Sequence, residues 1–263
     1  MTQEFLDALP IWGVFIVFAL LALALYELGF RLGRWQQDRT PEEKEGPTGM
    51  LVGSILALMA FLLAISMGMA TDRYDSRRGA VLGEANSIGT TFLRAGYLPD
   101  PASNESQELL REYVPLRIVS SDTPDEEIDA SLARSQEILD ELWSIAEGLA
   151  QKTPESEVLG LYIDTLNETI DANTTRVTAG LVARVPQTIV VLLFAGSALT
   201  LGMVGFNAGL TRRRSPLTAV VLIVVLGAVI ALIVDIDRPI GGTLTTGQQP
   251  LMDLQQQIGP PSL

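Results

Sequence analysis

The sequence predicts an all-α, multi-pass membrane protein in which two hairpins of transmembrane helices flank a helical soluble domain. Three observations predict this fold class. Of the 31 acidic residues, 21 lie between Asp72 and Asp171, while the apolar residues gather toward the two ends. Four apolar stretches are long enough to cross about 30 Å of hydrocarbon at roughly 1.5 Å per residue. No comparable stretch alternates apolar and polar residues with the period of two that a half-buried strand requires.

The first predicted hairpin occupies residues 1–70. We expect its helices at about 11–30 and 50–70, because Glu27 is the only charged residue in the first stretch and the second has none. The segment before them, MTQEFLDALP, has two acids and no base. That composition favours a retained membrane anchor over a cleaved signal peptide.

The second predicted hairpin occupies residues 186–239. Its helices are expected at about 186–210 and 217–235, separated by the short polar loop Thr-Arg-Arg-Arg-Ser-Pro. Residues 240–263 then form a C-terminal tail.

Residues 71–185 are predicted to form the acidic, helical soluble domain. The run Thr-Pro-Asp-Glu at 123–126 combines a capping hydroxyl, a first-turn proline and acids that complement the helix dipole. Beyond it, apolar residues recur every three or four positions, as on an amphipathic helix. We expect soluble helices at about 72–97, 103–120, 124–151 and 154–184, the first continuing the second span.

Composition excludes several classes of function. The chain has no Cys and no His, which excludes disulfides, Cys or His zinc sites, thiol nucleophiles and imidazole bases. No constellation of acids or hydroxyls suits intramembrane chemistry, so we predict neither an enzyme nor a cofactor. The net charge of −13 argues against nucleic-acid binding, which requires a basic footprint.

The side of the membrane that the soluble domain faces stays open. Arginines and a lysine in the two short loops, at 31–44 and 212–214, place the loops in the cytoplasm and the acidic domain outside. Arg73, Arg77 and Arg78 flank the opposite side almost as densely. We expect a multi-pass protein of the bacterial plasma membrane.

Small residues recur every three or four positions in two predicted spans: Gly53, Ala57, Ala60, Ala64 and Gly68 in the second, and Ala195, Ala198, Gly202, Gly205 and Gly209 in the third. Each set lies on one helical face and allows close approach of another helix. Alternatively, one stripe lines a narrow pore in an oligomer, with Ser54 or Ser66 as its polar contacts.

Charged residues at the membrane boundary are candidate ion contacts. Glu27 lies near the end of the first span, where it either contacts an ion or pairs with Arg31 or Arg34. Arg73, Arg77, Glu84 and Asn86 follow the second span and are candidate mouth residues of a pore, Arg77 and Glu84 sharing one helical face. The alternative for the arginines is that they anchor the helix among lipid headgroups.

The last span ends in Val-Asp-Ile-Asp-Arg-Pro. Asp235 and Asp237 are candidate ligands of a hard cation, although two carboxylates fall well short of a full calcium shell. The alternative is an Asp–Arg clamp, including Arg238, that holds the C-terminal tail. Whether any metal binds is left open.

Several segments resemble one family: 72–78 (Asp-Arg-Tyr-Asp-Ser-Arg-Arg), 84–90 (Glu-Ala-Asn-Ser-Ile-Gly-Thr), 92–99, 109–113 and 235–239. They are similar to bacterial membrane proteins with a bestrophin-like domain. The resemblance implies kinship with bestrophins, pentameric anion channels with two helical hairpins around a cytosolic helical domain. The Asn-Pro-Pro neck of bestrophins is absent here, so no bestrophin pore or calcium residue is carried over. The acidic domain, with 21 acids against 10 bases, would also deplete chloride near its surface.

The leading hypothesis is therefore a bestrophin-like ion channel, with anions as the ion that the resemblance implies. We expect the lipid bilayer as surroundings, self-association into a homo-oligomer, and inorganic ions as partners. The alternative is a non-conducting, membrane-anchored interaction or sensor protein whose acidic domain binds a partner or a cation.

Overall fold

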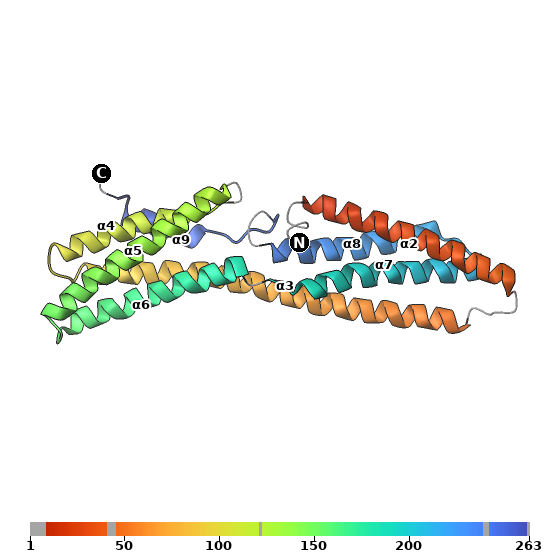
Figure 1. Cartoon of the computed structure of the whole chain (residues 1–263), viewed down its shortest axis with the longest axis horizontal. Coiled ribbons are helices and arrows are strands. Elements are labelled where there is room, and N and C mark those ends of the chain that lie inside the picture. Colours follow the sequence, from red (N-terminus) through yellow and green to blue (C-terminus); the bar gives the residue numbers. More distant parts are fainter. Residues whose placement is uncertain (1–8, 41–45, 121–122, 183, 239–241, 262–263) are drawn as a thin grey trace. The chain divides into compact units, whose positions relative to one another are not determined.

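The computed structural model describes residues 9–40, 46–120, 123–182, 184–238 and 242–261. Within these ranges the chain is helical and contains no strand, which confirms the predicted all-α fold class (Figure 1). The chain divides into two compact units. Among the described residues, the first contains those up to 73, 184–238 and 242–244, and the second contains those from 74 to 182 and 245–261. The predicted boundary between hairpin and tail, at 239–240, lies outside the described residues.

The first unit holds the four apolar helices. They are α2 (Ile11–Arg39), the first part of α3 (Gly46–Ala95), α7 (Gln187–Leu210) and α8 (Pro216–Asp237). All four are long and apolar enough to span a membrane. Their outward side chains, including Leu20, Leu199 and Val221, are exposed, as expected for surfaces that contact lipid instead of water. Four predicted spans are thereby confirmed.

Helices α2 and α7 pack backbone against backbone, because glycines face each other where they cross. A Cβ atom added at Gly29 would overlap the carbonyl oxygen of Gly202, and one added at Gly205 would overlap that of Tyr26. Gly33 and Gly209 are equally close to the backbone of the opposite helix. Such small-residue contacts bring helices together where lipid supplies no hydrophobic driving force.

The second unit is a bundle of amphipathic helices. It consists of the rest of α3, α4 (Ala102–Leu116), α5 (Asp125–Lys152), α6 (Glu157–Val177), the π-helical turn η1 (Thr178–Val182) and α9 (Gln249–Ile258). Helix α5 begins after Pro124 with three acids in its first turn, where the helix dipole favours negative charge. Its stripe, including Ile138 and Leu142, is buried with Ile88, Tyr113 and Leu166 in one apolar core.

Two local features differ from the sequence prediction. Residues 178–182, expected as the continuation of an α-helix to 184, form a π-helical turn. The tail contains helix α9, whose Leu251, Leu254 and Ile258 are buried in the core of the second unit. The helix is short, and it begins with glutamine and proline in place of a strong capping residue. Its stability therefore depends on the core that covers its apolar face.

Candidate functional site

Glu84 is the centre of a buried polar cluster in the second unit. Its side chain has no exposed surface and projects from the buried face of α3, between Val81 and Ile88. Arg117, which follows α4, donates its Nε hydrogen to Oε1 of Glu84 at 2.8 Å. The Tyr113 hydroxyl donates to the same oxygen at 3.3 Å. A carboxylate buried at this depth is tolerated because charged donors compensate its lost hydration.

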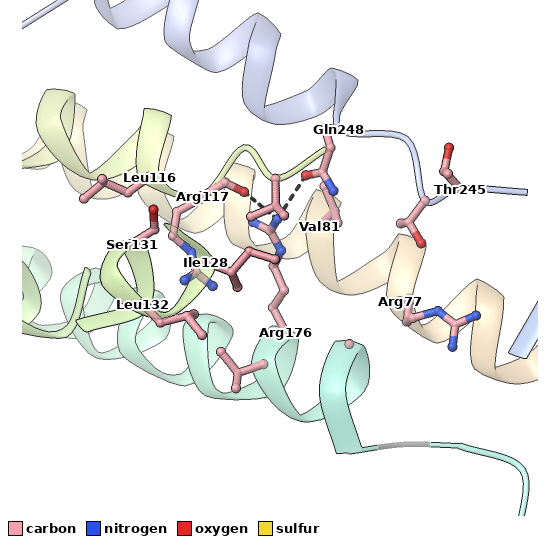
Figure 2. A pocket seen from close by; sticks show the side chains of 14 residues that line it. Arg77, Val81, Leu116, Arg117, Ile128, Ser131, Leu132, Arg176, Thr245 and Gln248 are labelled. Carbon is pink, nitrogen blue, oxygen red and sulfur yellow. Dashed lines mark hydrogen bonds between the residues drawn. The ribbon is translucent and has the colours of Figure 1, made fainter. Parts of the chain in front are cut away.

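Arg176 completes the cluster from α6. One of its terminal nitrogens donates to Oε2 of Glu84, and the other donates to the carbonyl oxygen of Arg117 at 2.5 Å and to Oε1 of Gln248 at 3.0 Å. Figure 2 shows Arg176 between the Arg117 carbonyl and Gln248. The cluster therefore joins α3, the end of α4, α6 and the residue before α9.

The buried surroundings also act on Tyr113. Burial raises the pKa of its phenol above the ordinary value, the positive charge of Arg117 lowers it, and Glu84 raises it again. The guanidinium of Arg117 lies over the Tyr113 ring, 5.7 Å from its centroid. Tyr113 therefore remains a neutral hydrogen-bond donor to Glu84 at physiological pH.

A pocket of about 130 Å³ adjoins this cluster. Arg117, Arg176 and Gln248 line it together with apolar residues from α3, α4 and α5 and with Gly180 of η1 (Figure 2). Arg77 also lines it, and only 4% of its surface is exposed.

The predicted mouth residues take different positions on α3. Arg77 and Glu84 lie on its buried side, whereas Arg73 and Asn86 are exposed. Asn86 lines a groove between α3 and α6 that also includes Gly83 and Thr90 of α3 and Ala172 of α6. Two residues along a helix are about 200° apart, which is why Glu84 is buried and Asn86 is not.

The membrane-segment candidates bind neighbours within the first unit. Glu27 pairs with Arg31, at 3.1 Å, and with Arg214 from the loop before α8. The hydroxyls of Ser54 and Ser66 each donate to the carbonyl oxygen four residues earlier, at 3.0 and 2.8 Å. Ser54 is exposed and Ser66 is buried.

The acids at the end of α8 hold backbone segments. Asp235 accepts a hydrogen bond from the backbone nitrogen of Thr243 at 2.9 Å and another from its hydroxyl. Asp237 accepts from the backbone nitrogen of Val185 at 2.8 Å, and Arg238 donates to the carbonyl oxygen of Leu9 at 2.5 Å. In the described ranges no three acidic side chains come together as metal ligands would.

The partners of Glu84, which are Arg117, Arg176 and Tyr113, were not predicted from the sequence. One feature of the sequence indicates that Glu84 requires basic partners. Glu84 follows Val81 on the apolar stripe of α3, so its burial calls for basic partners in a domain that has few bases. Which arginines supply them depends on the tertiary fold.

The sequence and the fold of this chain were compared with those of known proteins. No curated protein matches the sequence. Two crystal structures of a bestrophin homologue from Klebsiella pneumoniae, each with a point mutation, are similar. One has a TM-score of 0.66 at 16% identity over 92% of this chain and 95% of that chain. The other has a TM-score of 0.65 at 18% identity over 93% and 96%.

A third crystal structure, described as a membrane protein, has a TM-score of 0.65 at 17% identity and covers 93% of this chain and 95% of its own. The shared fold and the four apolar helices indicate a membrane protein. The model of the bestrophin-like domain matches residues 13–251, nearly the whole chain. The chain belongs to the bestrophin-like domain family.

Proposed function

We propose that this protein is one subunit of a homo-oligomeric ion channel whose pore is lined by α3. The observation that carries the proposal is an exposed face of small residues on this helix. In the first unit the face consists of Gly53, Ala57, Ala60, Ala64 and Gly68.

The small residues of α3 and those of α7 have different surroundings. Gly205 and Gly209 of α7 are in contact with the backbone of α2. A Cβ atom added at Gly53 or Gly68 of α3 meets nothing within 4 Å. A stripe of small residues that packs against no helix of its own subunit suits a narrow ion path or a second copy of the chain.

Family membership supports the same proposal. The similar structures are those of a bestrophin homologue, and bestrophins are the channels that the sequence resemblance implies. Four spans in one subunit form a poor conduit, so several copies would surround the pore. The resemblance implies anions, whereas the acidic second unit favours cations near its surface. The recording experiment described below is therefore designed to identify the permeant ion.

We assign the predicted residues two roles in this channel. Arg73 and Asn86, both exposed on α3, are mouth residues that an ion would meet. Glu84, which is buried and bonded to Arg117 and Arg176, positions α3 without facing the ion path.

Planar-bilayer recording of the purified protein, reconstituted in liposomes, tests this function. We expect step-like single-channel currents, and the reversal potential in a salt gradient identifies the ion. Ala64→Phe, on the small-residue face, should reduce the unitary current. Leu199→Phe, on an exposed position of α7, should leave it unchanged. Silent bilayers over a range of ions, pH and calcium, with folded and inserted protein, would refute the proposal.

The oligomer can be tested separately, because the chain contains no cysteine. A single cysteine introduced by Gly68→Cys should form a disulfide between copies under mild oxidation. It should also render the current sensitive to thiol reagents. Leu199→Cys is the matched control and should do neither.

A further inference from the structure

We propose that the pocket beside Arg117 binds a small carboxylate monoanion with a short hydrocarbon tail. The pocket lies entirely within the second unit, and its volume is about 130 Å³. The binding site is independent of whether the protein conducts ions. Its three properties are a guanidinium with donors to spare, a net positive charge on the cluster of Arg117, Arg176 and Glu84, and an apolar wall.

Arg117 supplies the donors. Only 4% of its surface is exposed, and its side chain makes a single hydrogen bond, from Nε to Glu84. Among the described residues, its terminal nitrogens Nη1 and Nη2 have no hydrogen-bond partner. Figure 2 shows its guanidinium pointing toward the α5 residues that line the pocket. A buried guanidinium has five N–H donors, and two parallel ones match the two oxygens of a carboxylate.

Arg176 does not compete for the same ligand. Its terminal nitrogens already donate to Glu84, to the carbonyl oxygen of Arg117 and to Gln248. The positive charge of Arg176 nevertheless adds to the net charge of the site. Two arginines around one carboxylate leave a net charge of +1 in a buried setting, which a monoanion would neutralise.

Arg77 lies at another part of the pocket. In Figure 2 its guanidinium points away from Arg117 and Arg176. The anion is therefore expected at Arg117, next to the hydroxyl of Ser131.

Much of the pocket wall is apolar. This part consists of Val81, Leu116, Val119, Ile128, Leu132 and Val177. An apolar cavity of about 150 Å³ accommodates benzene, so a pocket of this size has room for about seven non-hydrogen atoms, which is a carboxylate with a tail of about four carbons. Such a wall favours a hydrocarbon over the hydration shell of a phosphate or a bare halide.

The ligand probe is pentanoate, added to the full-length protein in detergent and followed by isothermal titration calorimetry. Pentanamide has nearly the same shape without the charge, and chloride has the charge without the tail. We expect pentanoate to bind about 10-fold to 100-fold more tightly than pentanamide, the range for losing a charge-assisted hydrogen-bond pair. Chloride should bind more weakly than pentanoate as well.

Two substitutions test the paired donors of Arg117 and the space in the pocket separately. Arg117→Lys keeps the charge but removes the fork of two donors, and should weaken pentanoate binding about 10-fold. Gly180→Leu leaves every charge in place. Gly180 lines the pocket, and an added Cβ there meets no protein atom within 4 Å, so a leucine can occupy the pocket without displacing the chain.

Gly160→Leu is the matched control for the second substitution. Gly160 lies on α6, is exposed and is equally free of contacts, but it does not line the pocket. We expect Gly180→Leu to abolish pentanoate binding and Gly160→Leu to retain it. If the Arg117→Lys variant does not fold, the comparison of Gly180→Leu with Gly160→Leu tests the proposal by itself.

Three results would overturn the proposal: folded wild-type protein that binds no pentanoate, pentanamide or chloride that binds as tightly as pentanoate, and unchanged affinity in Gly180→Leu.

Discussion

Arg117 and Glu84 lie 33 positions apart in the chain, yet the Nε–H of Arg117 and the Oε1 of Glu84 form a 2.8 Å ion pair in the interior of the second unit. Both side chains are almost fully buried. With Arg176 from α6, this pair joins three helical segments around one carboxylate. A buried charge whose partner is removed is far more destabilising than an exposed one, so breaking this pair should cost the unit much more than breaking an ion pair on its surface.

Glu84→Gln tests that statement. The substitution preserves the shape of the side chain but leaves Arg117 and Arg176 uncompensated, and it should destabilise the fold by about 3–5 kcal/mol. Thermal unfolding in detergent, followed by circular dichroism, measures the loss.

Glu112→Gln is the control for this prediction. Glu112 also binds an arginine, Arg134, but both side chains are substantially exposed and screened by water, so the substitution should leave the stability nearly unchanged. Equal destabilisation by the two substitutions would contradict a special role of the buried cluster.

Gly205→Ala should disrupt the packing of α2 on α7. The new methyl group would overlap the backbone of Tyr26, so the two helices must move apart. We expect a cost of about 1–3 kcal/mol and a lower melting temperature in detergent. Gly160→Ala, on the exposed surface of α6, adds the same methyl group in open space and should not lower the melting temperature. If both variants lower the melting temperature equally, contact between the helix backbones is not the reason for the effect of Gly205→Ala.

Leu251→Ala should show that α9 is part of the core. Leu251 is fully buried, so the cavity left behind should cost about 2–5 kcal/mol. Met252, the next residue, is 41% exposed, and Met252→Ala should cost much less. Urea unfolding of the helical signal measures both. If the two variants unfold alike, α9 does not contribute to the core as described.

Alkaline pH should destabilise the second unit through Tyr113. Burial raises the pKa of this phenol, so the folded protein retains a proton that the unfolded chain releases above about pH 10. Its stabilising contribution is complete below that pH and is lost as the pH rises toward the folded value. Tyr113→Phe should therefore unfold with a weaker dependence on pH between about 9 and 11 than the wild-type protein. If the melting temperatures of the two proteins fall equally with pH across this range, Tyr113 does not contribute to the loss of stability.

The sequence by itself determined the membrane character and the helical class of this protein. Transfer into lipid depends on the summed hydropathy of neighbouring residues, so uncharged stretches such as 50–70 identify a span without knowledge of any contact. The three acids in the first turn of α5 and its apolar stripe likewise act within one helix, which made that element predictable, although the Thr123 hydroxyl bonds to Ser120 and does not cap the helix.

Only the tertiary structure decided which residues meet. Glu84 pairs with Arg117 and Arg176, which lie 33 and 92 positions later in the chain. No local sequence pattern encodes this pairing. The stripes of small residues on α3 and α7 are similar in sequence, but only that of α7 is in contact with α2. Helix α9 was not predicted because a short helix gains its stability from the core that covers it. Pairing and burial depend on distant parts of the chain, whereas hydropathy and capping depend on neighbours.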